Sequence, residues 1–234
     1  MLLPFRPTRR RWHIFSIKIW GKLAARILGI SIKVKGEPPE PPFFLVSNHL
    51  STVDIVVYAA CLGNLFVAKS EISKWPLIGW ITRDIGTIFI ARRNFQDIPR
   101  VMGLINKTLD EGLGIILFPE GTSTKGDKIL PFSPALLEPA VRGNYPVSYA
   151  SISYRTAPDE APAYAAVCWW GDTTFLQHAG ALLKLARFDA CLIFGSHAIK
   201  ADDRKTLAKS LWNAMNDQFI PVVESSSVNH EREV

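Results

Sequence analysis

The stretch FFLVSNHLSTVD, residues 43–54, determines how the rest of the sequence is interpreted. It begins with four apolar residues that predict a short buried strand, and it leads into an apolar segment at 54–62 that predicts a helix. A polar loop that carries His49 joins the two. Strand, loop and helix in this order form the repeating unit of a sheet with helices on its faces.

The same alternation extends over most of the chain. Apolar and β-branched runs predict further strands at residues 65–68, 87–90, 114–118, 146–154, 163–169 and 189–195. Helical spacing predicts helices at residues 12–30, 97–111, 173–187 and 202–217. We therefore expect a single α/β domain with a mixed, mostly parallel sheet flanked by helices, at residues 36–220. An N-terminal segment, 1–35, precedes it and a loose tail, 221–234, follows it.

Composition excludes several classes of protein. With 234 residues, 48% of them hydrophobic, the chain can bury one core, which excludes a disordered protein. No phosphate-binding loop or serine-hydrolase elbow occurs, and neither histidines nor cysteines show the spacing of a metal site or a disulfide framework. The cysteines are Cys61, Cys168 and Cys191. We expect neither a metal ion nor a bound cofactor.

The positive charge is concentrated at one end of the chain. The formal net charge is +6, but residues 1–36 hold nine basic and no acidic side chains, which leaves 18 basic against 21 acidic residues elsewhere. As a helix, residues 12–30 place Lys18, Lys22 and Arg26 on one stripe beside a broad apolar face. That face comprises Trp12, Ile17, Trp20, Leu23, Ile27, Leu28 and Ile30.

Such a helix is typical of the headgroup region of a membrane. Its charged residues interrupt the apolar sequence too often for the helix to span a bilayer. We therefore expect a monotopic protein on the cytoplasmic face of a membrane. A nucleic-acid partner is not expected, because the basic residues alternate with aliphatic ones and no nucleic-acid-binding module follows. A helix packed on the protein's own core, with a solvated basic edge, explains the same pattern, and both interpretations can hold together.

Two motifs carry reactive side chains directly after predicted strands. His49 and Asp54 would point about 140° apart on one helix, so they meet only if His49 lies in the loop and Asp54 in the first helical turn. The carboxylate would then hold one imidazole nitrogen and leave the other free as a base. Glu120 follows another strand in the turn FPEGT. Taken singly, the motifs also fit structural roles, with Ser51 and Thr52 as helix caps and Glu120 as a turn carboxylate.

Together the motifs resemble the glycerolipid acyltransferase family, typified by 1-acyl-sn-glycerol-3-phosphate acyltransferase. His49-x4-Asp54 precedes FPEGT by about 70 residues, and other blocks of the family have counterparts in the same order. These counterparts are KSE at 69–71, PLIGW at 76–80, GTIFIAR at 86–92, YPV at 145–147, WWGD at 169–172 and DRK at 203–205. The resemblance extends from about residue 36 to about residue 217.

The resemblance implies direct transfer of an acyl group from acyl-CoA or acyl-carrier protein, as co-substrate, to a lysolipid hydroxyl at a membrane surface. It implies that His49 removes the hydroxyl proton while Asp54 holds the ring. The tetrahedral intermediate needs N–H donors, for which the backbone near His49 or Gly121 is the candidate. The implied substrate-binding residues are Glu120, Gly121 and Thr122 for positioning the acceptor, and Lys69 and Arg92 for its phosphate.

One position departs from the family pattern. Members that acylate lysophosphatidic acid commonly have an arginine directly after Glu-Gly-Thr, whereas this chain has Ser123, followed by Thr124 and Lys125. The loss of a bidentate phosphate ligand weakens the case for lysophosphatidic acid, which stays the favoured acceptor. The alternatives are a lyso-ornithine lipid or glycerol 3-phosphate as acceptor, a lysophospholipase that uses water, and a non-catalytic lipid-binding module.

Overall fold

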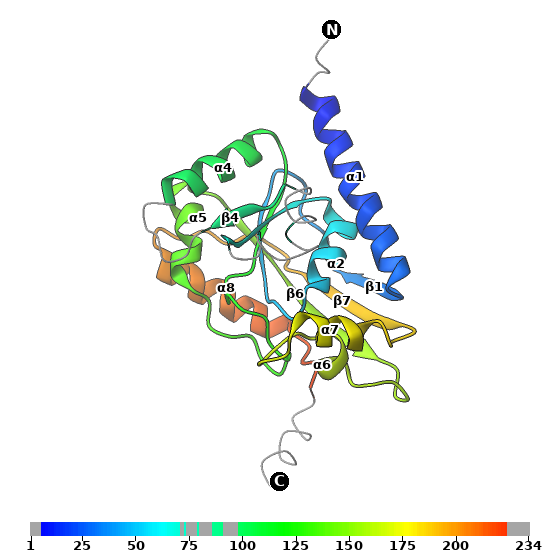
Figure 1. Cartoon of the computed structure of the whole chain (residues 1–234). Helices are drawn as coiled ribbons and strands as arrows, with labels where there is room; N and C mark the ends of the chain where they lie inside the picture. Colours follow the sequence, from blue (N-terminus) through cyan, green and yellow to red (C-terminus); the bar gives the residue numbers. More distant parts are fainter. Residues whose placement is uncertain (1–5, 71–72, 74–78, 80–85, 91–97, 224–234) are drawn as a thin grey trace.

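The computed structural model of the chain describes residues 6–70, 73, 79, 86–90 and 98–223, with the backbone alone for residues 6–11, 69 and 98. Within these residues a seven-stranded sheet has the strand order β1-β7-β6-β2-β5-β3-β4. The sheet lies at the centre, between the helices (Figure 1). Neighbours from β6 to β4 are parallel, whereas β7 and β1 run in the opposite direction. The strands are β1 (Ile30–Lys35), β2 (Phe44–Ser47), β3 (Leu65–Lys69), β4 (Ile88–Ile90), β5 (Ile115–Leu117), β6 (Val147–Thr156) and β7 (Phe188–Phe194). The expected mixed, mostly parallel α/β sheet is confirmed.

Helices cover both faces of this sheet (Figure 1). One layer contains α1 (Arg6–Ile27), α2 (Val53–Leu62), α6 (Ala163–Ala166) and α7 (Phe175–Leu182). The other contains α4 (Ile98–Asp110), the 3₁₀ turn η3 (Pro134–Leu137), α5 (Glu138–Arg142) and α8 (Arg204–Gln218). Successive residues of β2 point to opposite faces, so Leu45 packs in the first core and Phe44 and Val46 in the second. A strand buried on both faces is apolar throughout, as the sequence of β2 is.

Two segments differ from the sequence-based expectation. Residues 163–169 were predicted as a strand, but they begin with the short helix α6, which follows Pro162 and contains three alanines among its four residues. Alanine favours helix over strand, and proline is well placed directly before a helix. The N-terminal helix was predicted to reach residue 30, but it ends at Ile27, and residues 30–35 form β1, which pairs with β7. The alternation of apolar and polar residues in ISIKVK is the strand signal that the helix prediction overlooked.

One side of α1 packs along α2. Ile17, Gly21 and Ala25 are buried on this side, four residues apart. A Cβ atom on Gly21 would lie 2.3 Å from the backbone nitrogen of Ala60, so only glycine allows the two helices to approach this closely. Packing on the protein's own core therefore accounts for this side of α1.

The apolar face expected for the N-terminal helix is thus divided. Ile17, Leu28 and Ile30 belong to the protein core, whereas Trp12, Leu23 and Ile27 remain exposed. No helix in the described part of the chain is both long and apolar enough to cross a bilayer.

Candidate active site

The two sequence motifs lie together because β2 and β5 are neighbouring parallel strands. The chain leaves the carboxyl end of β2 toward α2 on one face of the sheet, and it leaves β5 toward η3 and α5 on the other face. Such a switch point is where open α/β sheets bind their ligands. His49 follows β2 and Glu120 follows β5, so the topology brings both to this edge.

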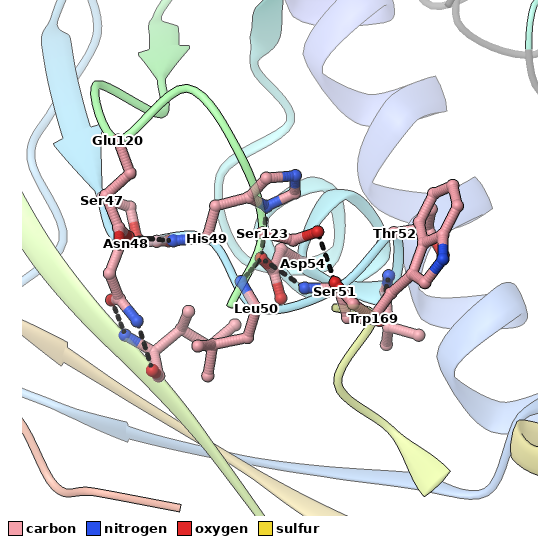
Figure 2. Close-up of polar contacts among 12 residues, drawn as sticks. Ser47, Asn48, His49, Leu50, Ser51, Thr52, Asp54, Glu120, Ser123 and Trp169 are labelled. Carbon is pink, nitrogen blue, oxygen red and sulfur yellow. Dashed lines mark hydrogen bonds and ion pairs between the residues drawn. The ribbon is translucent and has the colours of Figure 1, made fainter. Parts of the chain in front are cut away.

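His49 and Asp54 form a hydrogen-bonded pair. Because α2 begins at Val53, Asp54 lies in its first turn while His49 lies in the preceding loop. His49 Nδ1 and Asp54 Oδ2 are 2.7 Å apart, which is the arrangement that the spacing in the sequence required (Figure 2). Among the described residues His49 Nε2 has no partner, and 23% of the His49 side chain is exposed.

Asp54 is fully buried and receives hydrogen bonds from several parts of the protein. The backbone N–H groups of Leu50 and Ser51 donate to Asp54 Oδ2 over 2.8 and 3.2 Å. The hydroxyl group of Tyr154 donates to Asp54 Oδ1 over 2.6 Å. These bonds hold the carboxylate in one orientation, in which Oδ2 faces His49 Nδ1 as an acceptor. In the neutral tautomer that matches this contact, Nδ1 carries the proton and Nε2 carries the lone pair.

Phe118 fixes the plane of the His49 ring. The two rings stack with their centroids 4.3 Å apart and their planes 20° apart. Phe118 follows β5 directly and stacks in turn on Phe66 of β3, so the sheet determines its position. The imidazole is therefore held by a carboxylate at one edge and by an aromatic ring on one face.

Glu120 connects the two motifs through backbone N–H groups. Its Oε1 accepts from the N–H of His49 and its Oε2 from the N–H of Leu130, each over 2.8 Å. Burial raises the pKa of Glu120 from 4.5 to about 7 and Asp54 acts in the same direction, while the two backbone hydrogen bonds lower it. Both oxygens hold the protein's own backbone, so Glu120 positions the His49 loop. The acceptor-binding role implied by the resemblance stays a prediction.

The raised pKa of Glu120 predicts a pH-dependent stability. Between pH 4.5 and 7 the folded protein binds a proton at Glu120 that the unfolded chain releases, so lowering the pH across this range favours folding. The gain is at most about 3 kcal/mol. Glu120→Gln removes this titration. As the pH is lowered from 8 to 5, the unfolding free energy of the wild type should therefore increase relative to that of the variant. Denaturant unfolding of both proteins measures it, and parallel pH profiles would contradict the assignment.

The other residues expected to bind substrate lie at the same edge or outside the described residues. Gly121 is buried with φ of 78°, a left-handed conformation that glycine adopts without strain. Thr122 beside it is exposed. Lys69 is the last residue of β3, the neighbour of β5, whereas Arg92 is not among the described residues. Phosphate binding by Lys69 and Arg92 stays a prediction.

Ser123, at the position of the expected arginine, is bonded to the protein itself. Its hydroxyl group donates to the carbonyl oxygen of Trp169 over 2.5 Å. Lys125 Nζ lies 3.8 Å from Asp127 Oδ2 and 5.8 Å from the centre of the Trp170 ring. Neither side chain provides a bidentate phosphate ligand in this arrangement.

The backbone N–H groups near the motifs are already engaged within the protein. Those of residues 49–51 donate to the two carboxylates described above, and that of Gly121 donates to the carbonyl oxygen of Phe118 over 3.2 Å. These amides are therefore not free to bind an oxyanion in this conformation. Across the described ranges, no three His, Cys, Asp or Glu side chains gather as a metal site requires.

Two contacts of the site were not accessible from the sequence. Tyr154 reaches Asp54 from β6, across 100 positions in the sequence. The Asn48 side chain exchanges hydrogen bonds of 2.9 and 2.8 Å with the backbone of Ile152, which attaches the residue before His49 to the same strand. Both contacts depend on β2 and β6 being neighbours, and no local pattern reports that pairing.

Comparison with known proteins gives consistent matches. The Acyltransferase family model matches residues 14–153, which is more than half of the chain. A lyso-ornithine lipid O-acyltransferase from Rhodobacter capsulatus is 30% identical over 212 residues, covering 88% of this chain and 76% of that protein. A 1-acyl-sn-glycerol-3-phosphate acyltransferase from Neisseria gonorrhoeae is 33% identical over 162 residues, covering 64% of this chain and 62% of that protein.

A solved structure shares the fold. The crystal structure of the 1-acyl-sn-glycerophosphate (LPA) acyltransferase PlsC from Thermotoga maritima superposes with a TM-score of 0.63 at 23% identity. The superposition covers 91% of this chain and 82% of that one. The sheet and its two helical layers therefore have the PlsC fold.

Proposed function

The chain belongs to the acyltransferase family, and we propose that it transfers a fatty acyl group from a thioester to the hydroxyl group of a lysolipid. The observation that carries the proposal is the His49–Asp54 pair at the switch point of the sheet, in which Nδ1 is bonded to the carboxylate and Nε2 has no partner within the described part of the chain. The names of the relatives above, which include two lysolipid acceptors, support the same reaction class.

The reaction requires one general base and no covalent enzyme intermediate. His49 Nε2 takes the proton of the acceptor hydroxyl as its oxygen attacks the thioester carbonyl carbon, and Asp54 stabilises the imidazolium that forms. The tetrahedral intermediate then breaks its C–S bond, and the imidazolium returns the proton to the departing sulfur. An ester and a free thiol remain. Acyl-CoA and acyl-carrier protein both supply such a thioester, and either is compatible with this scheme.

The acceptor is a lysolipid of one of two chemical classes. Lysophosphatidic acid is the acceptor that the sequence resemblance favours, with Lys69 and Arg92 proposed to bind its phosphate. A lyso-ornithine lipid is the second candidate. Ser123 favours the lyso-ornithine lipid, because it stands where an arginine would bind a phosphomonoester. Its hydroxyl group is bonded to Trp169 instead.

A panel of lysolipids tests the proposed function. Purified protein is incubated with lysophosphatidic acid, lyso-ornithine lipid, glycerol 3-phosphate or no acceptor, each with acyl-CoA and with acyl-carrier protein, and the products are identified by mass. Acceptor-dependent release of thiol together with a diacylated lipid is the expected result. Free fatty acid as the main product would identify a hydrolase instead, and no thioester consumption with any acceptor would contradict the proposal.

We further propose that α1 binds a membrane surface, at the cytoplasmic face where thioester donors are found. The side of α1 opposite Ile17, Gly21 and Ala25 carries exposed apolar residues four or three positions apart. They are Trp12, Phe15, Ile19, Leu23 and Ile27. The exposed cations Lys22 and Arg26 lie beside this stripe. Apolar and cationic stripes side by side are typical of helices that lie in the headgroup region.

Substitution of the α1 stripe should weaken membrane binding. Leu23 and Ile27 are 57% and 82% exposed, so Leu23→Gln/Ile27→Gln removes apolar surface without opening the core. We expect binding to anionic vesicles to fall roughly tenfold or more, and added salt to weaken the remaining electrostatic part. Vesicle sedimentation measures this, with Leu104→Gln on α4 of the other layer as the matched control. Deleting residues 1–35 is less informative, because it would remove β1 from the sheet. Unchanged sedimentation of the α1 variant would contradict the anchor.

A further inference from the structure

Exposed large apolar side chains gather on two segments of one helical layer. Among the described residues, five belong to α1 and three to the segment that leads into and through α7. The three are Trp170, Leu176 and Leu183, which are 38%, 80% and 72% exposed. Leu176 and Leu183 are seven residues apart, so they point outward from the same side of the helix and its last turn. Most of the surface of Leu176 and Leu183 is left uncovered by the described part of the chain, whereas Trp170 is partly covered.

The two apolar segments meet at one end. Phe188 donates its backbone N–H to Gly29 over 3.1 Å, and a Cβ on Gly29 would lie 2.4 Å from the carbonyl oxygen of Ala186. The chain that follows α7 therefore contacts the turn that follows α1. Ile27 and Leu183, both strongly exposed, lie within a few residues of this contact. Figure 1 shows α1, α2 and α7 on the same side of the sheet.

The opposite side of α7 contacts the loop between β2 and α2 that carries His49, here called the catalytic loop. His178 is 2% exposed, and its Nε2 lies 3.3 Å from Thr52 Oγ1 and 3.4 Å from Ser51 Oγ. The His178 ring stacks on Trp169 with centroids 5.6 Å apart, and the N–H of Trp169 donates to the carbonyl oxygen of Leu50 over 2.7 Å. These contacts are made by residues between His49 and Asp54. The outer side of α7 is therefore separated from the loop that carries His49 by the width of one helix, about 10 Å.

Charge on this segment suits an anionic lipid surface. Lys184 and Arg187 are exposed directly after Leu183, and Lys125 lies against the Trp170 ring. Asp172 is the one acidic residue between positions 170 and 187. Leucines that enter the acyl region, a tryptophan at the boundary and cations beside them match the layers of a bilayer surface.

We propose that the outer face of α7, with Leu176 and Leu183, and the exposed Trp170 in the segment before it form a second membrane-contact surface. With α1 it would hold the catalytic loop against an anionic bilayer, so that a lysolipid reaches His49 with its acyl chain still in the membrane. The inference rests on the proposed lipid substrates, but its test measures membrane binding and can fail independently of the chemistry.

Leu176→Gln/Leu183→Gln tests the α7 surface. Binding of the full-length protein to vesicles of phosphatidylglycerol and phosphatidylcholine should fall roughly tenfold or more, in addition to the effect of Leu23→Gln/Ile27→Gln. Acylation of a vesicle-embedded lysolipid should fall by a similar factor, whereas acylation of a short-chain soluble acceptor should stay within twofold. Leu104→Gln, which also removes an exposed leucine from a helix, should change neither measurement.

A second measurement uses the wild-type protein, in case the variant folds poorly. Hydrogen exchange should slow over residues 175–183 when vesicles are added. Unchanged vesicle binding of the variant, or unchanged exchange over these residues, would overturn the proposal. Loss of self-association without loss of vesicle binding would identify a protein interface and overturn it as well. Absence of acyl transfer with vesicle binding intact would count against the proposed function alone.

Discussion

Replacement of the proposed base, His49→Ala, should lower kcat/KM for acyl transfer by roughly 10²–10⁴-fold, which is the usual contribution of a positioned general base. The variant lacks Nε2, the atom that is proposed to take the hydroxyl proton. The fold should persist, because His49 lies in a loop, is partly exposed, and is bonded through a backbone N–H that alanine retains. Acceptor-dependent thiol release measures the rate. The mass of the product verifies that the thiol release comes from ester formation.

His197→Ala is the matched control for this variant. His197 is also partly solvent-exposed and contacts Ser196 at the surface, 3.0 Å from its Oγ, away from the two motifs. It should retain activity within twofold, and both variants should unfold near the wild-type temperature. Equal thioester consumption by wild type and His49→Ala would refute general-base catalysis by His49 and would favour a non-catalytic lipid-binding module.

The fold was largely predictable because its strands are buried on both faces. The two cores are filled by alternate residues of β2, with Leu45 in one and Phe44 and Val46 in the other. The strand is therefore a continuous apolar run in the sequence. The edge strand β1 was not predicted because burial decreases along it, from the buried Ile30 to the exposed Val34, and its two lysines continue the basic pattern of the preceding helix. The strand expected at 163–169 was wrong because an alanine-rich apolar run fits a short buried helix equally well.

The site was predictable where its contacts are local. His49 and Asp54 meet within one loop and one helical turn, so their spacing restricts the geometry strongly. The bond from Glu120 to the backbone of His49 depends on the adjacency of β2 and β5, which sequence order does not reveal, because β3 and β4 come between them along the chain. Similarly, the hydroxyl of Tyr154 and the ring of Phe118 act on the pair through tertiary contacts alone.

Asp54→Asn should also lower activity by roughly 10²–10⁴-fold, although this residue touches no substrate in the proposed mechanism. Asparagine has no charge to stabilise the imidazolium, and its amide group can donate to Nδ1 and hold the proton on Nε2, where it blocks the base. In that orientation the amide NH₂ group would also face the backbone N–H groups of Leu50 and Ser51, which in the wild type donate to Asp54 Oδ2. Leaving such a buried donor unpaired costs about 1–3 kcal/mol, so the unfolding free energy should fall as well.

The two effects are separated by a second variant and a double variant. Tyr154→Phe removes one hydrogen bond to Asp54 Oδ1 but keeps the carboxylate, so it should lose stability with less than a tenfold change in rate. In the His49→Ala background, Asp54→Asn should reduce the residual rate by less than tenfold, because a residue that acts through His49 has nothing left to orient. The measurement is kcat/KM for the four members of the cycle. Independent, multiplicative losses would show that Asp54 contributes by another route and that the pair is not the catalytic unit.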